Sequence, residues 1–130
     1  MREDVKNLWV KALRSGNYKQ GLGRLHRQGA EGDVYCCLGV LCELAIKMGV
    51  DVSTDSRYGS REYDGELCVL PASVREWAEM YSSDGTLDDA VEVELGEDDE
   101  MFSALDAYND DAGATFDQIA DVIEKQWESI

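Results

Sequence analysis

The chain has four cysteines, and three of them lie within seven positions of one another, in the segment YCCLGVLCEL of residues 35–44. Thiols this close suggest a metal site, a redox pair, or small side chains that fill a core. Structural zinc sites usually hold their cysteines in two pairs, with two to four residues between the members of each pair. Here Cys36 and Cys37 are adjacent, four residues separate Cys37 from Cys42, and Cys68 lies alone 26 positions further on, so no second pair completes such a site. We therefore expect no metal site, and buried free thiols, because cysteine is among the most often buried residue types.

Nucleophilic catalysis needs a base beside the nucleophile, and His26 is the only histidine. The cysteines lie in apolar sequence, which raises the pKa of a thiol. The chain's 28 acidic residues offer too many carboxylate pairs for two to be selected as an acid and a base. Gly21-Leu-Gly23 is followed by neither a dinucleotide fingerprint nor a Walker lysine. The sequence therefore identifies no catalytic residue and no cofactor.

A basic segment near the N-terminus is the strongest candidate for ligand binding. Residues 1–27 contain seven lysines and arginines against two acids, in a chain of net charge −16. Cationic and aromatic side chains lie here beside glycine-containing backbone, a combination that suits a nucleotide or another small anion. The candidate ligand-binding residues are Arg14, Tyr18, Lys19, Gln20, Arg24, His26 and Arg27. The alternative is that these side chains pair with the protein's own acidic C-terminal half and hold the termini together.

Negative charge dominates the C-terminal part, where residues 82–130 contain sixteen acids and a single base, Lys125. A field of this sign repels nucleic acid, so direct DNA or RNA binding is not expected. Acids on a surface increase solubility, and they can also dock on a basic protein or, in two ordered rows, imitate DNA. Aromatic residues anchor many interfaces. The candidate partner-binding residues are Glu97, Asp98, Asp99, Glu100 and Trp127.

Helices are predicted where apolar residues recur at helical spacing. The four main ones are a leading helix from a cap at Asp4 to a stop at Gly16, a helix between Gly39 and Gly49, a helix after Pro71, and a terminal helix that begins at a Thr115–Gln118 capping box. A short fifth helix is expected over residues 101–108.

Strand signals are weaker. A hairpin is predicted around the turn at residues 28–33, with residues 34–37 as its returning strand. Residues 67–71 are typical of a short buried strand, and residues 87–95 alternate apolar and acidic side chains as a half-exposed strand does. Residues 51–65 suggest irregular structure, and residues 97–100 a solvated loop or a helix start.

These elements predict an α+β fold, a single domain over residues 1–130 with about four helices packed on a small antiparallel sheet. Apolar runs are too short for a signal peptide or a membrane span. We therefore expect a cytoplasmic protein with no membrane partner.

Four segments together have a recognisable pattern: KALRSGNYKQGLGRL, YCCLGVLCELA, LPASVREWAEM and LDAYNDDAGATFDQIADVIE. They resemble a family of small uncharacterised proteins of tailed phages and prophages, most specifically in the CCLGVLC block and the NDxxxTFxxIADxIE ending. The resemblance implies a phage-encoded accessory protein that acts in the cytoplasm of an infected bacterium. It implies no activity and no catalytic residue.

We expect non-catalytic binding to a host component, in counter-defence or host takeover. The binding surface would be either the acidic C-terminal part, against a host protein, or the basic N-terminal hairpin, against a nucleotide-like anion. One alternative is a small enzyme that acts on a nucleotide-like substrate at the same hairpin, assisted by Tyr18, Arg24 or His26. The other is an acidic DNA mimic.

Overall fold

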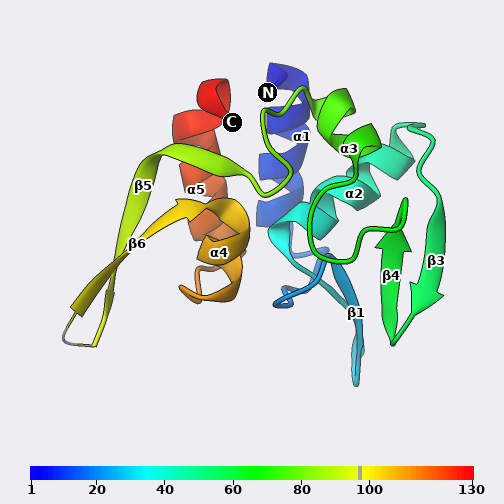
Figure 1. Cartoon of the computed structure of the whole chain (residues 1–130), viewed down its shortest axis with the longest axis horizontal. Helices are drawn as coiled ribbons and strands as arrows, with labels where there is room; N and C mark the ends of the chain where they lie inside the picture. Colours follow the sequence, from blue (N-terminus) through cyan, green and yellow to red (C-terminus); the bar gives the residue numbers. More distant parts are fainter. Residues whose placement is uncertain (97) are drawn as a thin grey trace.

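The chain folds into helices flanked by three separate β-hairpins, as the computed structural model in Figure 1 shows. The structure describes residues 1–96 and 98–130. In these residues the helices are α1 (Glu3–Arg14), α2 (Cys37–Lys47), α3 (Ala72–Ala78), α4 (Leu105–Asp110), α5 (Phe116–Gln126) and a 3-10 turn, η1 (Trp127–Ser129). The antiparallel pairs are β1 (His26–Gly29) with β2 (Gly32–Tyr35), β3 (Thr54–Arg57) with β4 (Ser60–Tyr63), and β5 (Thr86–Leu95) with β6 (Asp98–Ala104). The α+β class is confirmed, with three two-stranded sheets in place of one.

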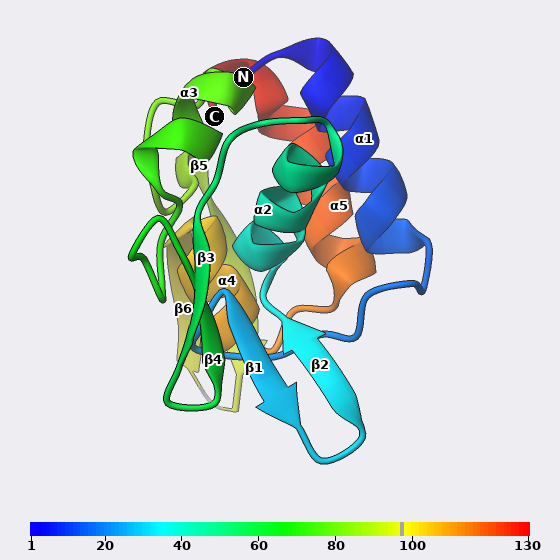
Figure 2. The same cartoon turned by 90° about the vertical axis from the view of Figure 1, so that its right-hand side faces the viewer.

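Buried apolar residues surround α2, which lies at the centre of the helical body (Figure 2). Every residue from Cys37 to Cys42 is buried, as is typical of a central helix. Gly39 lies inside this helix, which begins at Cys37, three residues before the expected start at Val40. A β-carbon at Gly39 would lie 1.7 Å from the carbonyl oxygen of Leu25. The backbone that leads into β1 therefore lies directly against α2 at this glycine.

The cysteines of the central block are buried, as predicted, whereas Cys68 is exposed. Burial raises the pKa of Cys36 to about 12 and the pKa of Cys37 and Cys42 well above the ordinary thiol value, because an apolar interior disfavours a thiolate. Across residues 1–96 and 98–130, no three His, Cys, Asp or Glu side chains are grouped to hold a metal ion. The buried thiols pack as small apolar side chains.

This burial predicts a simple labelling pattern. The native protein should react quickly with one equivalent of a chromogenic thiol reagent, at Cys68, and with four equivalents after unfolding in denaturant. The variant Cys68→Ser should lose the fast phase and keep three slow thiols. Fast labelling that persists in Cys68→Ser would show that the central block is open to solvent.

Helices α1 and α5 pack side by side and bring the two ends of the chain together (Figure 1). Their buried stripes are Val5, Trp9, Val10 and Leu13 on α1 and Phe116, Ile119, Ala120 and Ile123 on α5. The predicted capping box is confirmed, since Thr115 and Gln118 each bond the other's backbone N–H through a side-chain oxygen. The cap of α1 is Arg2 and not the predicted Asp4.

Two predictions near the middle of the chain were wrong: residues 51–65 are not irregular, and residues 67–71 are not a strand. Residues 51–65 contain the β3–β4 hairpin, which turns through Tyr58 and Gly59, both with positive φ, as a two-residue type I′ turn requires. Residues 67–71 form no strand, although the Leu67 carbonyl accepts a 2.8 Å hydrogen bond from the backbone N–H of Leu25.

The boundaries of three further elements differ from prediction. Strand β2 ends at Tyr35, because the following residues enter α2. Residues 98–100 belong to β6 and form neither a loop nor a helix start. Residues 101–104 continue that strand, and α4 begins only at Leu105. The predicted strand over residues 87–95 is confirmed as β5.

Candidate functional site

The seven candidate ligand-binding residues do not form one site. Arg14 belongs to a contact between two helices. Its guanidinium lies 2.6 Å from Asp121 and 3.9 Å from both Asp117 and Glu124, all on α5. Arg14 therefore joins α1 to the acidic C-terminal helix, which is the structural alternative that the sequence left open.

Three more candidates fasten the loop after α1 to its surroundings. The Tyr18 hydroxyl accepts a 2.9 Å hydrogen bond from Lys47 on α2, and the Lys19 ammonium lies 3.3 Å from Glu31. The Gln20 amide donates to the Asn109 side chain at 2.9 Å and to the Ala114 carbonyl at 2.7 Å. These contacts position the loop.

His26 is a buried bridge between two hairpins. Its Nδ1 accepts a 2.9 Å hydrogen bond from the backbone N–H of Arg61, so Nε2 carries the proton and donates to Asp33 at 3.0 Å. The ring also meets Tyr35 edge-on, with 5.3 Å between centroids. Both ring nitrogens are engaged, which suits a positioning role better than proton transfer.

Arg24 and Arg27 do come together, in a groove between β1 and the β3–β4 turn. The groove has a volume of about 250 Å³ and is lined by Arg24, Arg27, Gln28, Tyr58, Gly59 and Ser60. The backbone N–H of Gln28 donates to the Gly59 carbonyl at 2.8 Å, which fixes one hairpin against the other. Sequence reasoning missed Gln28, Tyr58 and Ser60. The available signal was the glycine in RYGSRE, which marks a turn between two short polar strands.

The β5–β6 hairpin projects from the helical body (Figure 1). We call residues 88–96 and 98–100 of this hairpin the acidic arm. Its exposed carboxylates are Asp88, Asp89, Glu92, Glu94, Asp98, Asp99 and Glu100. In the part of the chain that the structure describes, none of them forms a salt bridge. Of the predicted partner-binding residues, Asp98, Asp99 and Glu100 lie on this arm, and Glu97 lies outside the described residues.

Like charges face one another on the acidic arm. Glu94 lies directly opposite Asp99 in the antiparallel register, and like charges at facing positions destabilise a sheet. The sheet has only two strands, so both outer edges present free backbone groups. Gln126 holds the base of the arm, because its side chain exchanges hydrogen bonds of 3.2 and 2.8 Å with the backbone of Asp89.

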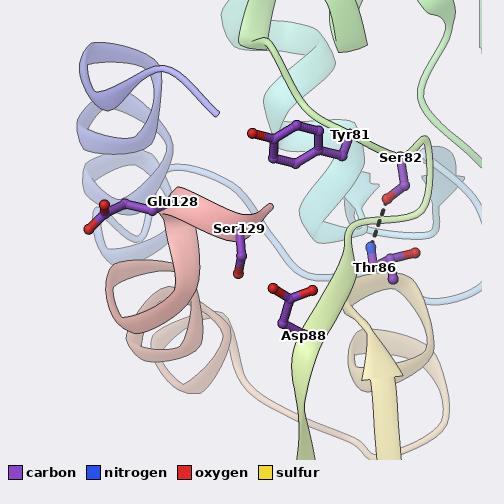
Figure 3. Close-up of a pocket in the computed structure, with 6 residues that line it drawn as sticks. All are labelled: Tyr81, Ser82, Thr86, Asp88, Glu128 and Ser129. Atoms are coloured by element: carbon purple, nitrogen blue, oxygen red, sulfur yellow. Dashed lines mark hydrogen bonds between the residues drawn. The ribbon is translucent and has the colours of Figure 1, made fainter.

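A pocket of about 540 Å³ lies at the base of the arm, between β5 and η1 (Figure 3). It is lined by Tyr81, Ser82, Thr86, Asp88, Glu128 and Ser129. Figure 3 shows the Asp88 carboxylate and the Ser129 hydroxyl turned toward one another below the Tyr81 ring, while Glu128 points away. Tyr81 is 77% exposed. The pocket combines a carboxylate, hydroxyls and an open aromatic ring, so it suits a cationic group that also donates hydrogen bonds.

The pocket is poorly equipped for nucleophilic catalysis. The Ser129 hydroxyl donates to the Gln126 carbonyl at 3.0 Å, and the Ser82 hydroxyl accepts from the backbone N–H of Thr86 at 2.8 Å. No histidine or cysteine lines it. A serine nucleophile needs a base that holds its proton, and these hydroxyls bond the backbone instead. The arrangement therefore favours binding.

Trp127, the last predicted partner-binding residue, lies on η1 beside this pocket and away from the arm. It is partly buried against the core, and the Lys6 ammonium lies 5.3 Å from the centre of its ring. With Tyr81, Glu79, Met1 and Glu128 it lines a second hollow of about 320 Å³. Tyr81 stands between the two hollows, and no periodic pattern in the sequence marked it.

The chain matches a family model, and the match covers both the Arg24–Arg27 groove and the acidic arm. Residues 1–127 match a family described as a domain of unknown function, DUF8296. The chain belongs to this family. No curated protein and no solved structure matches it. The DUF8296 match includes the Arg24–Arg27 groove and the acidic arm, and it ends just before Glu128 and Ser129 of the pocket.

No helix within residues 1–96 and 98–130 of this DUF8296 chain is long and apolar enough to cross a membrane.

Proposed function

We propose that the protein acts by non-catalytic binding, and that its acidic arm together with the Tyr81 pocket receives a basic segment of a protein partner. The unpaired carboxylates of the arm carry this proposal. They stand on a projecting hairpin in which Glu94 faces Asp99, and a partner's lysines and arginines would relieve that repulsion. Complementary charge accelerates encounter and selects the partner.

The Tyr81 pocket gives the partner a point of attachment. An arginine or lysine side chain that enters it would meet the Asp88 carboxylate below the ring and the face or edge of Tyr81 above. Aromatic residues and arginines dominate the energy of many interfaces, and a cation over an exposed ring adds about 0.5–1 kcal/mol. The pocket lies at the base of the arm, so one extended segment can reach both.

Charge density favours a basic protein over the imitation of DNA. The ten residues of β5 span about 34 Å at the antiparallel rise of about 3.4 Å per residue. Duplex DNA of that length carries about 20 phosphate charges. The arm presents the seven described carboxylates named above on two adjacent strands. That density is about a third of DNA's, and it matches a peptide with alternating basic residues.

A host protein is the class of partner that we propose, with the chain encoded by a phage and acting in the bacterial cytoplasm. Support for the phage origin is the resemblance of the CCLGVLC block and the NDxxxTF ending to proteins of tailed phages. Counter-defence and host takeover both fit a small protein that acts stoichiometrically, because mass action on one partner needs no turnover.

A defined probe tests the arm directly. We expect a fluorescent peptide of alternating arginine and valine to bind the protein in an anisotropy titration, and its glutamate–valine counterpart not to bind. The arm variant Glu92→Gln/Glu94→Gln/Asp99→Asn should weaken binding by about tenfold or more, as should Tyr81→Ala. Raising the salt from 50 to 300 mM should weaken binding of the wild-type protein, since exposed charges are screened.

The matched control neutralises three exposed acids elsewhere, Glu3→Gln/Asp51→Asn/Glu66→Gln, with the same change in net charge. It should bind the arginine–valine peptide within about twofold of the wild-type protein. Equal weakening by the control and the arm variant would reduce the effect to net charge and overturn the assignment of the arm. Absence of binding to the wild-type protein would overturn it as well.

A further inference from the structure

Two guanidinium groups face one groove without a carboxylate partner, in a protein of net charge −16. Arg2, Arg14, Arg57, Arg61 and Arg75 each lie within 4.0 Å of a carboxylate. Among the described residues, neither Arg24 nor Arg27 does. Arginines that avoid carboxylates in so acidic a molecule are available to an external anion.

The groove is built around a buried hydroxyl. Ser60 is only 3% exposed, and its Oγ accepts a 3.0 Å hydrogen bond from the Arg24 guanidinium. That bond uses one N–H of Arg24 and orients the planar group, which has further N–H donors. Because the Gln28 backbone also bonds the Gly59 carbonyl across the groove, both walls are held before any ligand arrives. A preformed site of this kind binds with less loss of conformational entropy.

An aromatic ring completes the groove. Tyr58 is 77% exposed at the β3–β4 turn and lies in the left-handed region, with φ of +52°. This conformation is unfavourable for a bulky residue, so the fold holds the ring outward at a cost. The guanidinium carbon of Arg57 lies 5.2 Å from the ring centre. Proteins that bind single-stranded nucleic acid without sequence preference stack its bases on aromatic side chains.

We propose that this groove binds a nucleoside monophosphate, with the phosphate on Arg24 and Arg27 and the base stacked on Tyr58. The volume of about 250 Å³ is on the scale of one such small ligand. The groove lies on the β1–β2 and β3–β4 hairpins, which are distinct from the hairpin of the acidic arm. Ligand binding here is therefore independent of the arm.

Isothermal titration calorimetry on the full chain tests the groove. The probes are the adenosine, guanosine, cytidine and uridine monophosphates, with ribose 5-phosphate and inorganic phosphate for comparison. We expect saturable binding of at least one nucleotide, and weaker binding of ribose 5-phosphate, which has no base. Arg27→Gln, at an exposed position, should weaken nucleotide binding by about tenfold or more through loss of the charge-assisted hydrogen bonds.

Tyr58→Asn separates the two halves of the site, because asparagine tolerates a positive φ. It should abolish the preference for the nucleotide over ribose 5-phosphate and leave inorganic phosphate binding unchanged. Arg75→Gln on α3 is the control for the loss of one positive charge, and it should bind the nucleotide as the wild-type protein does.

Three results would overturn the proposal: no nucleotide binding by the wild-type protein, equal weakening by Arg27→Gln and Arg75→Gln, or equal affinity for nucleotide and ribose 5-phosphate. The arm variant Glu92→Gln/Glu94→Gln/Asp99→Asn should retain nucleotide binding, so failure of either proposed surface leaves the other standing.

Discussion

Replacement of Gly39 by alanine should lower the free energy of unfolding by about 3 kcal/mol or more, the upper end of the usual range for overpacking. The new β-carbon would lie 1.7 Å from the Leu25 carbonyl oxygen and 2.6 Å from its carbon. Both obstructing atoms are backbone, so no side-chain rotation relieves the collision. Alanine is favoured over glycine in a helix by about 1 kcal/mol, and this gain is too small to offset the clash. Denaturant titration followed by circular dichroism measures the loss.

Gly49→Ala is the matched control for this substitution. Gly49 ends α2 with φ of +88°, and a β-carbon there would meet no atom within 4 Å. The cost is then only that of placing alanine in the left-handed region, about 1–2 kcal/mol. If Gly39→Ala is no less stable than Gly49→Ala, the chain before β1 does not lie against α2 as described.

Helices were predictable where their signals are local. The capping box at Thr115 and Gln118 and the stop at Gly49 each depend on residues within one turn of the helix end. The role of Gly39 was not predictable, because the requirement for glycine comes from Leu25, which is distant along the chain and close only after folding. The periodicity of the sequence indicated that the helix starts after Gly39. In the structure Gly39 lies inside the helix, where the Leu25 backbone contacts it.

The missed strands have a different cause. Strand β4 lies within a polar segment, yet the Tyr63 ring is fully buried and its hydroxyl donates to Glu43 on α2 at 2.8 Å. Glu43 also bonds Arg61, so one carboxylate holds two side chains of β4. Tertiary contacts of this kind override weak local propensity. Residues 101–104 were likewise drawn into β6 by pairing with β5, where Phe102 faces Val91.

The candidate basic site was only partly predictable for a geometric reason. Its members were grouped by nearness in sequence, but α1 carries Arg14 to α5, and the fold buries His26 between two hairpins. Arg24 and Arg27 reach the same groove only because the β3–β4 turn closes its other side. That turn supplies Tyr58, and nothing near residues 24–27 in the sequence indicates its arrival.

Asn109→Ala should be among the most damaging polar substitutions in the chain. The side chain is fully buried, and its oxygen accepts from the Cys37 backbone N–H at 3.3 Å and from Gln20 at 2.9 Å. Its nitrogen donates to the Gly21 carbonyl at 3.0 Å and to Asp110 at 2.8 Å. One amide thus joins α4, the start of α2 and the loop that leads to Arg24.

Truncation at Asn109 leaves buried donors and acceptors unpaired, and each such group costs about 1–3 kcal/mol. We expect a total loss of about 3–4 kcal/mol in denaturant titration, at the upper end of measured single substitutions. Asn17→Ala is the control, since that side chain is exposed and, among the described residues, only the Asn17 backbone N–H forms a hydrogen bond, to Ser15. This substitution should change stability by less than about 0.5 kcal/mol.

Hydrogen exchange at Gly21, whose N–H donates to the Tyr35 carbonyl at 2.7 Å, should accelerate in Asn109→Ala more than exchange within α5, because the loop loses its anchor first. Stability equal to that of Asn17→Ala would show that this amide is not the junction between the loop, α2 and α4, and the groove at Arg24 would then depend on the hairpins alone.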